Sequence, residues 1–138
     1  MGIEPTTRGF AARADLLDVE VAQLTRYVDT ANAARLEGTL SPTGRVSTEG
    51  ALRARASAAA AAERARAITA GTPYKWQVGH GPDTTWTGSA VGREWHDQTQ
   101  RVNASLGGSS RAYPIGYRPT IFQVKFVDGR LYPQITGG

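Results

Sequence analysis

The sequence predicts an α+β fold, with helices in the first part of the chain and a small antiparallel sheet at its end. Apolar residues recur at helical spacing between residues 14 and 36, and an Ala-rich stretch follows within residues 47–70. Apolar and polar residues alternate over residues 120–127, ahead of a strong turn sequence. Between these parts, residues 74–119 are rich in Gly, Pro, Ser and Thr and show little periodicity, so a loop-rich region is expected there.

The first predicted helix has one apolar face and ends near Gly38. Steps of three and four residues align its apolar positions, which are Leu17, Val21, Leu24, Val28 and Ala31. A helix with one apolar stripe has to lie against another element. We expect packing within the chain; binding of a partner protein to this face is the alternative.

The second predicted helix is capped by Ser47 or Thr48, runs to about Ala70, and is closed by Gly71. A turn at residues 40–44 separates the two helices, which we expect to form an antiparallel hairpin. The second helix carries several arginines that either follow a phosphate backbone or form a solvated face. They are Arg53, Arg55, Arg64 and Arg66.

The predicted sheet is a β-hairpin at the end of the chain. Asp128-Gly129 is typical of a two-residue turn between antiparallel strands. The return strand is expected over residues 130–135. Pro133 indicates that this strand lies at an edge, because proline has no N–H to donate to a neighbouring strand.

The charge of the chain is unevenly distributed. Residues 1–37 hold four arginines and six acidic residues, whereas residues 38–138 hold twelve basic and six acidic residues. Most basic residues are arginines, whose guanidinium group binds phosphate through two parallel hydrogen bonds. This distribution favours an anionic partner such as nucleic acid. The absence of cysteine excludes a disulfide scaffold and a thiolate zinc site.

The sequence also bears on location and on domain organisation. No apolar run reaches the about 18–20 residues of a membrane span, and residues 1–10 lack the apolar core of a signal peptide. Export would therefore need dedicated machinery or a longer parent chain. We expect residues 1–45 to form an N-terminal amphipathic segment and residues 46–138 to form the functional domain.

The residues His80-Gly81-Pro82-Asp83 are the candidate for chemistry. Pro82 disfavours a helical Gly81, so His80 and Asp83 are expected where a short strand at residues 75–78 runs into a loop. Phosphodiester hydrolysis needs a base, and histidine titrates near neutral pH. It also needs a cation, and a carboxylate binds Mg²⁺ through oxygen. As a bare pattern, His-x-x-Asp is a weak signal that occurs by chance in many proteins and is more often explained by a loop hydrogen bond of the histidine and a local turn at the aspartate.

Other polar residues are candidates for supporting roles. Arg101, Arg111 and Arg118 would hold a phosphate. Asn103 would orient a catalytic water or bind the cation, or else cap the backbone before a Gly-rich turn.

Several residues have a structural interpretation beside a functional one. The Gly-rich segment 105–109 either offers backbone N–H groups to a phosphate or simply turns the chain. His96 is expected to be a partly exposed loop histidine outside the site. Trp86, Tyr113 and Tyr117 either stack on bases or, as we expect, pin loops to the core.

Three blocks, at residues 79–88, 102–108 and 113–120, together resemble the signature of the bacterial polymorphic-toxin family called Novel toxin fifteen. The resemblance covers about residues 45–127. It implies nuclease activity that depends on a His-x-x-Asp motif, which maps onto His80 and Asp83. It also implies an effector delivered by type VI secretion and an immunity protein that guards the producer. Family members often carry long N-terminal delivery regions, whereas here about forty residues precede the matching part. This difference indicates a trimmed module or a small effector loaded with an adaptor.

Together these features predict an antibacterial toxin that hydrolyses DNA with Mg²⁺ or another divalent cation. His80 is the expected general base, Asp83 either binds the cation or orients His80, and Asn103 assists. The protein would be secreted by a specialised system and act in the cytoplasm of the target cell, with an adaptor and an immunity protein as partners. An RNase of the same family and a non-catalytic basic binding module are the alternatives.

Overall fold

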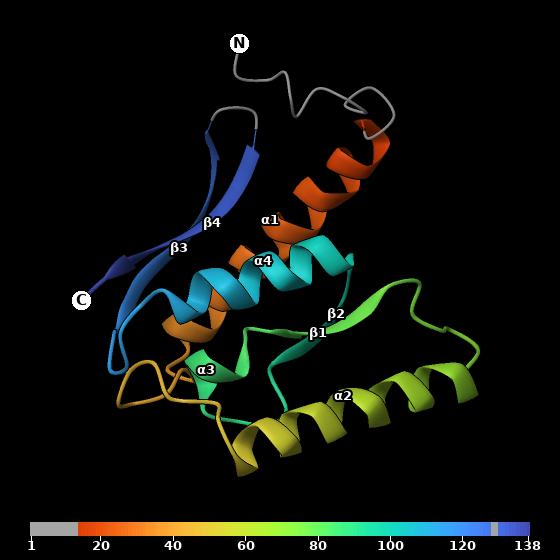
Figure 1. The fold of residues 1–138 in the computed structure, drawn as a ribbon, viewed down its shortest axis with the longest axis horizontal. Coiled ribbons are helices and arrows are strands. Elements are labelled where there is room, and N and C mark those ends of the chain that lie inside the picture. The colour runs from red at the N-terminus through yellow and green to blue at the C-terminus, as the bar shows by residue number, and fades with distance from the viewer. Residues whose placement is uncertain (1–13, 128–129) are drawn as a thin grey trace.

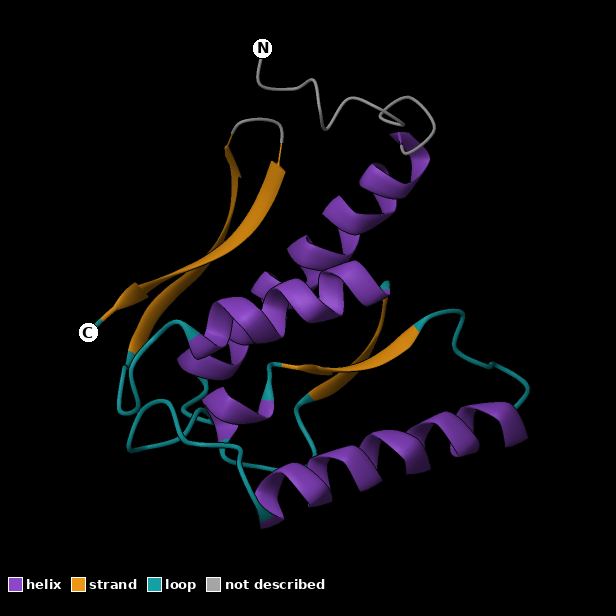
Figure 2. Cartoon of the chain, in the orientation of Figure 1, coloured by secondary structure: helices purple, strands orange, loops and turns teal. Residues whose placement is uncertain are grey.

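The computed structural model describes residues 14–127 and 130–138 (Figure 1). Two helices come first, and two antiparallel two-stranded sheets follow (Figure 2). A four-residue helix connects the strands of the first sheet, and a 12-residue helix lies between the two sheets in the chain. This is the predicted α+β organisation. In chain order the elements are α1 (Ala14–Leu36), α2 (Ala51–Thr69), β1 (Gln77–Gly81), α3 (Thr84–Thr87), β2 (Glu94–Gln98), α4 (Gln100–Arg111), β3 (Pro119–Val127) and β4 (Arg130–Gly137). None of the described helices has the length and apolar character to cross a membrane.

Helix α1 spans the predicted residues and is covered within the chain by β3 and β2. Leu24, Tyr27, Ala31 and Ala34 form its buried face, whereas Val21 is exposed. The predicted apolar stripe therefore faces the interior from Leu24 onward. The side chain of Leu17 lies outside the described residues.

Helix α2 differs in two ways from the prediction. It begins at Ala51 with Gly50 at the N-cap position rather than with Ser47 or Thr48. It lies against β1 rather than along α1, so the two helices do not form the expected hairpin (Figure 1). The buried apolar face of α1 is already covered by β3, and the inner face of α2 carries only small alanines beside Glu63, which suit close contact with a strand. Gly71 closes the helix with a φ of 81°, as predicted.

The structure corrects the expectation of irregular backbone over residues 74–119. This region contains β1, α3, β2 and α4. Strand β1 pairs with β2 in antiparallel register, with His80 opposite Trp95, so His80 lies in the strand rather than in a loop after it. The Gly-rich segment 105–109 is part of helix α4, which excludes both interpretations of it as a loop.

Helix α4 forms despite its Gly and Ser content for two reasons. The hydroxyl of Thr99 caps it by accepting a hydrogen bond from the N–H of Val102, at 3.1 Å. Val102, Leu106 and Ser110, spaced four residues apart, form its buried face. Tertiary packing thus outweighs the low helix propensity of the glycines.

One buried cluster joins α1, α3, α4 and the β3–β4 hairpin. It contains Leu24 and Tyr27 from α1, Trp86 from α3, Leu106 from α4, and Phe122 from β3, together with Ala31, Val102 and Ile135. The indole N–H of Trp86 donates to the hydroxyl of Ser110, at 2.9 Å. Trp86 is 1% exposed, which confirms its structural interpretation and fixes α3 at the point where the chain leaves Asp83.

The C-terminal β-hairpin matches its prediction. Strands β3 and β4 pair in antiparallel register from Pro119 opposite Gly137 to Val127 opposite Arg130. Phe122 is buried and Gln123 is exposed, as the alternation predicts. Pro133 lies on β4, an edge of this two-stranded sheet. The predicted Asp128-Gly129 turn and the side chain of Phe126 lie outside the described residues.

Candidate active site

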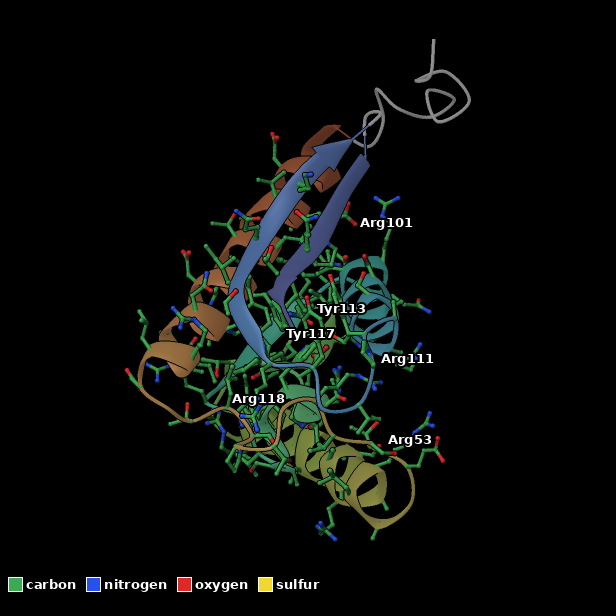
Figure 3. All side chains as sticks on the ribbon, turned by 90° about the vertical axis from the view of Figure 1, so that its left-hand side faces the viewer. Arg53, Arg101, Arg111, Tyr113, Tyr117 and Arg118 are labelled. Atoms are coloured by element: carbon green, nitrogen blue, oxygen red, sulfur yellow. The ribbon has the colours of Figure 1, made fainter. Side chains whose placement is uncertain are left out.

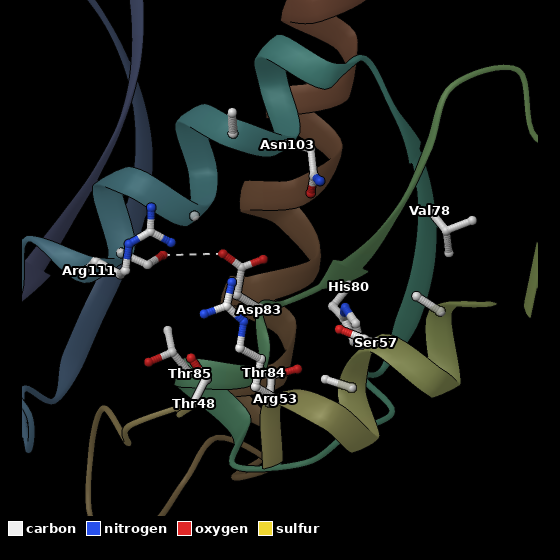
Figure 4. Close-up of a pocket in the computed structure, with 15 residues that line it drawn as sticks. Thr48, Arg53, Ser57, Val78, His80, Asp83, Thr84, Thr85, Asn103 and Arg111 are labelled. Carbon is white, nitrogen blue, oxygen red and sulfur yellow. Dashed lines mark hydrogen bonds between the residues drawn. The ribbon is translucent and has the colours of Figure 1, made fainter. Parts of the chain in front are cut away.

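A cleft of about 450 Å³ lies between α2 and α4, with β1 and α3 at its base (Figure 4). It brings together His80, Asp83, Asn103 and Arg111 from the predicted site. Small side chains on the two helices leave room between them. The lining residues are Thr48, Arg53, Ala56, Ser57 and Ala60 from the α2 side, Val78, His80, Asp83, Thr84 and Thr85 from β1 and α3, and Asn103, Ala104, Gly107, Ser110 and Arg111 from α4.

His80 is held in one orientation at the base of the cleft. Its Nε2 lies 2.9 Å from the backbone oxygen of Ala90. A carbonyl oxygen only accepts hydrogen bonds, so Nε2 carries the proton and Nδ1 keeps its lone pair. The ring lies against Trp95, with the centroids 4.7 Å apart. Burial lowers the pKa of His80, so the ring is neutral at neutral pH and ready to accept a proton.

Asp83 follows β1 and precedes α3, but its side chain does not cap that helix. Its backbone N–H donates to the hydroxyl of Tyr27, at 3.2 Å, and its Oδ2 accepts from the hydroxyl of Ser110, at 3.3 Å. Burial raises the pKa of Asp83 to about 6, although the hydrogen bonds from Ser110 and Tyr27 and the charge of Arg111 oppose this rise. Asp83 is therefore mainly ionised at neutral pH.

Asn103 lies on α4 and faces the same cleft (Figure 4). Its backbone N–H donates to the oxygen of Thr99 inside the first turn of the helix, so Asn103 is not the backbone cap of the alternative interpretation. Its side-chain amide has no hydrogen-bond partner among the described residues. The amide is thus available to a ligand in the cleft.

The donor set of the cleft suits a hard divalent cation with an incomplete protein shell. Asp83 offers a carboxylate and Asn103 an amide oxygen, which are the oxygen ligands that Mg²⁺ prefers. Within residues 14–127 and 130–138, no three His, Asp or Glu side chains gather into a closed metal site. A cation held here would take much of its coordination from water and from substrate oxygens, as Mg²⁺ commonly does in phosphate chemistry.

The predicted phosphate-binding arginines are not all in one place. Arg101 and Arg111 lie at opposite ends of α4, and only Arg111 lines the cleft (Figure 3). The guanidinium of Arg101 binds Glu20 of α1 through two hydrogen bonds, at 2.8 and 2.9 Å. Arg118 donates to the backbone oxygen of Pro42, at 2.8 Å, outside the cleft. Arg53 of α2 lines the cleft, although its sequence spacing did not distinguish it from the other arginines of that helix.

His96 is not the partly exposed loop residue that the sequence predicted. It lies on β2 and is 2% exposed, with Nε2 3.1 Å from Glu94 Oε1 and 3.4 Å from Thr30 Oγ1. Burial lowers its pKa. A Cβ atom on Gly81 would lie 2.5 Å from the His96 ring, so the residue after His80 has to be glycine for this packing. His96 thus supports β1 and does not line the cleft.

Sequence reasoning missed the residues that position Asp83. Tyr27 and Ser110 come from helices that are far apart in the chain, and each contacts Asp83 by one hydrogen bond. The spacing of Val102, Leu106 and Ser110 is the signal that indicates a helix with Ser110 on its inner face. Tyr27 lies three residues after Leu24 and four before Ala31, so its spacing places it on the buried face of the helix, but nothing in the sequence indicates that its hydroxyl contacts Asp83.

Comparison of the chain with protein-family models, curated proteins and solved structures finds no match. A neutral imidazole with a free lone pair, an ionised carboxylate and a free amide line the same cleft as Arg53 and Arg111. Such a set can deprotonate a nucleophile and bind an anionic substrate.

Proposed function

We propose that the chain is a toxin that hydrolyses phosphodiester bonds of DNA in the cleft between α2 and α4. One observation carries the proposal: His80 and Asp83 share this cleft with Asn103 and with two guanidinium groups that have no carboxylate partner among the described residues. A polyanionic substrate would supply the negative charge that these guanidinium groups lack. A hydrolytic reaction would use the neutral imidazole of His80 to accept a proton from water.

In the proposed reaction, His80 acts as the general base. Its Nδ1 accepts a proton from a water molecule as the water oxygen attacks phosphorus. The bond from phosphorus to the leaving oxygen then breaks, and that oxygen takes a proton from solvent. The hydrogen bond from His80 Nε2 to Ala90 keeps the ring in the tautomer that this step needs.

Asp83 and Asn103 would hold Mg²⁺ or another divalent cation. When bound, the cation neutralises negative charge that develops on the phosphate oxygens. Of the two roles considered for Asp83, ligand and orienter of His80, the first is better supported. His80 is oriented by Ala90, and the oxygen bonds of Asp83 come from Ser110 instead.

The biological role is proposed from the three blocks of residues that resemble Novel toxin fifteen. They support an antibacterial effector that leaves its cell through a specialised secretion system and acts in the cytoplasm of the target cell. A cognate immunity protein and a secretion adaptor are the partners that this role requires.

The first test is incubation of purified protein and Mg²⁺ with supercoiled plasmid and, in parallel, with total RNA. We expect nicking of the plasmid by the wild type, its loss in EDTA, and a rate about 10²–10⁴ lower for His80→Ala. Cleavage of RNA but not of DNA would show that RNA, and not DNA, is the substrate. Intact nucleic acid in every lane, or full activity of His80→Ala, would contradict the proposal.

Arg111→Gln and Arg118→Gln form a matched pair in the same assay. Both remove one positive charge from the same region of sequence, but only Arg111 lines the cleft. Arg111→Gln should slow cleavage by about tenfold or more, since hydrogen bonds to charged groups contribute about 1.5–3 kcal/mol. Arg118→Gln should remain close to the wild type.

A further inference from the structure

Arg53 and Arg111 approach the cleft from opposite walls. Arg53 stands on the first turn of α2 and Arg111 on the last turn of α4, and Figure 4 shows both guanidinium groups turned toward Asp83. Neither forms an ion pair with a carboxylate within the described ranges. Other arginines do so: Arg26 with Glu94, Arg66 with Glu63, Arg93 with Glu37, and Arg101 with Glu20.

The surroundings leave these two positive charges largely uncompensated. The first turn of α2 has no acidic residue and no side-chain cap. Asp83 is the one carboxylate among the described residues that line the cleft, and neither Arg53 nor Arg111 forms an ion pair with it. A helix N-terminus also attracts negative charge. This end of the cleft therefore favours an anion.

A second feature at the same place is a polar atom without a partner. The side chain of Thr84 lines the cleft, yet its hydroxyl is buried and makes no hydrogen bond with the described residues. The neighbouring Thr85 is also buried, but its hydroxyl donates to the backbone oxygen of Val46. Buried hydroxyl groups are normally satisfied, and an orphan in a cleft indicates a missing ligand.

We propose that Arg53, Arg111 and the Thr84 hydroxyl form a subsite for a phosphate group of a nucleic-acid strand. The guanidinium groups bind the phosphate oxygens from two sides, and the hydroxyl donates a third hydrogen bond after a small displacement of the side chains above it. The inference rests on the proposed nuclease function in naming nucleic acid as the source of the phosphate. It assigns α2, and not α4 alone, to substrate binding.

The subsite explains why the cleft walls are built from small residues. Ala56 and Ala60 of α2 face Ala104 and Gly107 of α4 across the cleft. Side chains of this size let a phosphate backbone pass between the helices and reach the arginines. Larger residues at these positions would fill the path.

The test measures binding and not turnover, in full-length protein that carries His80→Ala to prevent cleavage. In this background, Arg53→Gln is compared with Arg55→Gln, a neighbour on the same helix that is exposed and does not line the cleft. The affinity for a fluorescein-labelled DNA oligonucleotide is measured by anisotropy over a range of salt concentrations. Arg53→Gln should weaken binding about tenfold and lower the salt slope by about one, and Arg55→Gln should change both less. Equal effects of the two variants would overturn the subsite.

A second readout separates this inference from the proposed function. Inorganic phosphate is titrated into the wild type while the Nε–H signals of the arginines are followed by NMR, with and without Thr84→Val. We expect the Arg53 and Arg111 signals to shift together, and to shift at higher phosphate concentration in the variant. If phosphate shifts the arginine signals but the protein has no nuclease activity, the subsite is supported and the proposed function is contradicted. Nuclease activity without shifts at these two residues would remove the subsite and leave the function standing.

Discussion

The carboxyl group of Asp83 combines a functional position with an unfavourable environment. Its pKa in the folded protein is raised to about 6 by burial, above the 3.8 of a free side chain. The folded state therefore binds more protons than the unfolded state between these two values. Stability falls as the pH rises through this window, because folding then has to bury the charge. The proposed function needs the ionised form of Asp83 at neutral pH, so the folded protein is less stable there than it would be with a neutral side chain at this position.

Asp83→Asn should therefore stabilise the protein while it abolishes the proposed cleavage. At pH 8 we expect an increase of about 2 kcal/mol in the free energy of unfolding, and a difference near zero at pH 4, where the wild-type carboxyl is protonated in the folded state. Urea denaturation at the two pH values in EDTA measures this, with Asp29→Asn on the exposed face of α1 as the control. A variant that is less stable than the wild type at pH 8 would contradict this prediction, because it would show that the hydrogen bonds and the nearby positive charge stabilise the carboxylate by more than burial destabilises it.

Thr84 and Thr85 offer a comparison between two adjacent buried hydroxyl groups. The Thr84 hydroxyl has no partner in the described protein, whereas that of Thr85 binds the backbone oxygen of Val46. Valine has the same shape as threonine without the hydroxyl. Thr84→Val should raise the free energy of unfolding by about 1 kcal/mol, and Thr85→Val should lower it by about 1–2 kcal/mol, since an unpaired buried group is costly and a paired one is not. Thermal unfolding of both variants without ligand measures the difference; a loss of stability in both would mean that Thr84 is satisfied after all.

The C-terminal hairpin has two free edges, and side chains occupy both at the same register. On β3, Asn32 of α1 donates to the oxygen of Phe122, at 2.9 Å, and accepts from its N–H, at 2.8 Å. On β4, the N–H of Ile135, the residue opposite Phe122, donates to the hydroxyl of Tyr113, at 2.9 Å. The hairpin is thus fixed to the core through backbone groups that would otherwise be unpaired, which also protects its edges from pairing with other chains.

Removing these edge contacts should destabilise the fold in proportion to the bonds lost. Asn32→Ala leaves both backbone groups of Phe122 without a partner and should cost about 2–4 kcal/mol. Tyr113→Phe should cost about 1 kcal/mol, and Tyr117→Phe less, because the hydroxyl of Tyr117 lies 3.5 Å from the Ile135 oxygen. Urea denaturation gives the three values; an Asn32→Ala variant as stable as the wild type would exclude the edge role of Asn32.

Elements with a clear periodicity could be predicted from the sequence, and elements made by tertiary contacts could not. Helix α1 and the β3–β4 hairpin have apolar patterns that match their periods, and both were predicted near their observed bounds. Helix α4 contains Gly107 and Gly108, and its sequence resembles a loop when its packing partners are unknown. Strand β1 is short and rich in glycine, because His96 and Gln98 occupy the space that side chains at Gly81 and Gly79 would fill.

For the whole molecule, the site could be predicted in part. Residues close in sequence, such as His80 and Asp83, were predicted as candidates from their own chemistry, and both line the same cleft. Partners distant in sequence, such as Tyr27 and Ser110, can be identified only when the fold brings α1 and α4 next to Asp83. This arrangement also decides which arginine lines the cleft and which pairs with a carboxylate: Arg101 neutralises the buried Glu20, while Arg111, one helix length away, faces the cleft.

The same long-range packing predicts that residues 46–138 do not fold alone, although they carry the whole lining of the cleft. Helix α1 supplies Leu24 and Tyr27 to the buried cluster, and Tyr27 also binds the backbone of Asp83. Without α1, apolar surface of Trp86 and Phe122 is exposed to water, at a cost of several kcal/mol in a domain whose total stability is about 5–15 kcal/mol. We expect the 46–138 fragment to lack the dispersed NMR spectrum of the full chain and the proposed DNA cleavage, and a peptide of residues 14–45 to restore both when added in excess. A fragment that is folded and active by itself would place the core boundary after α1 and assign that helix a role outside the catalytic unit.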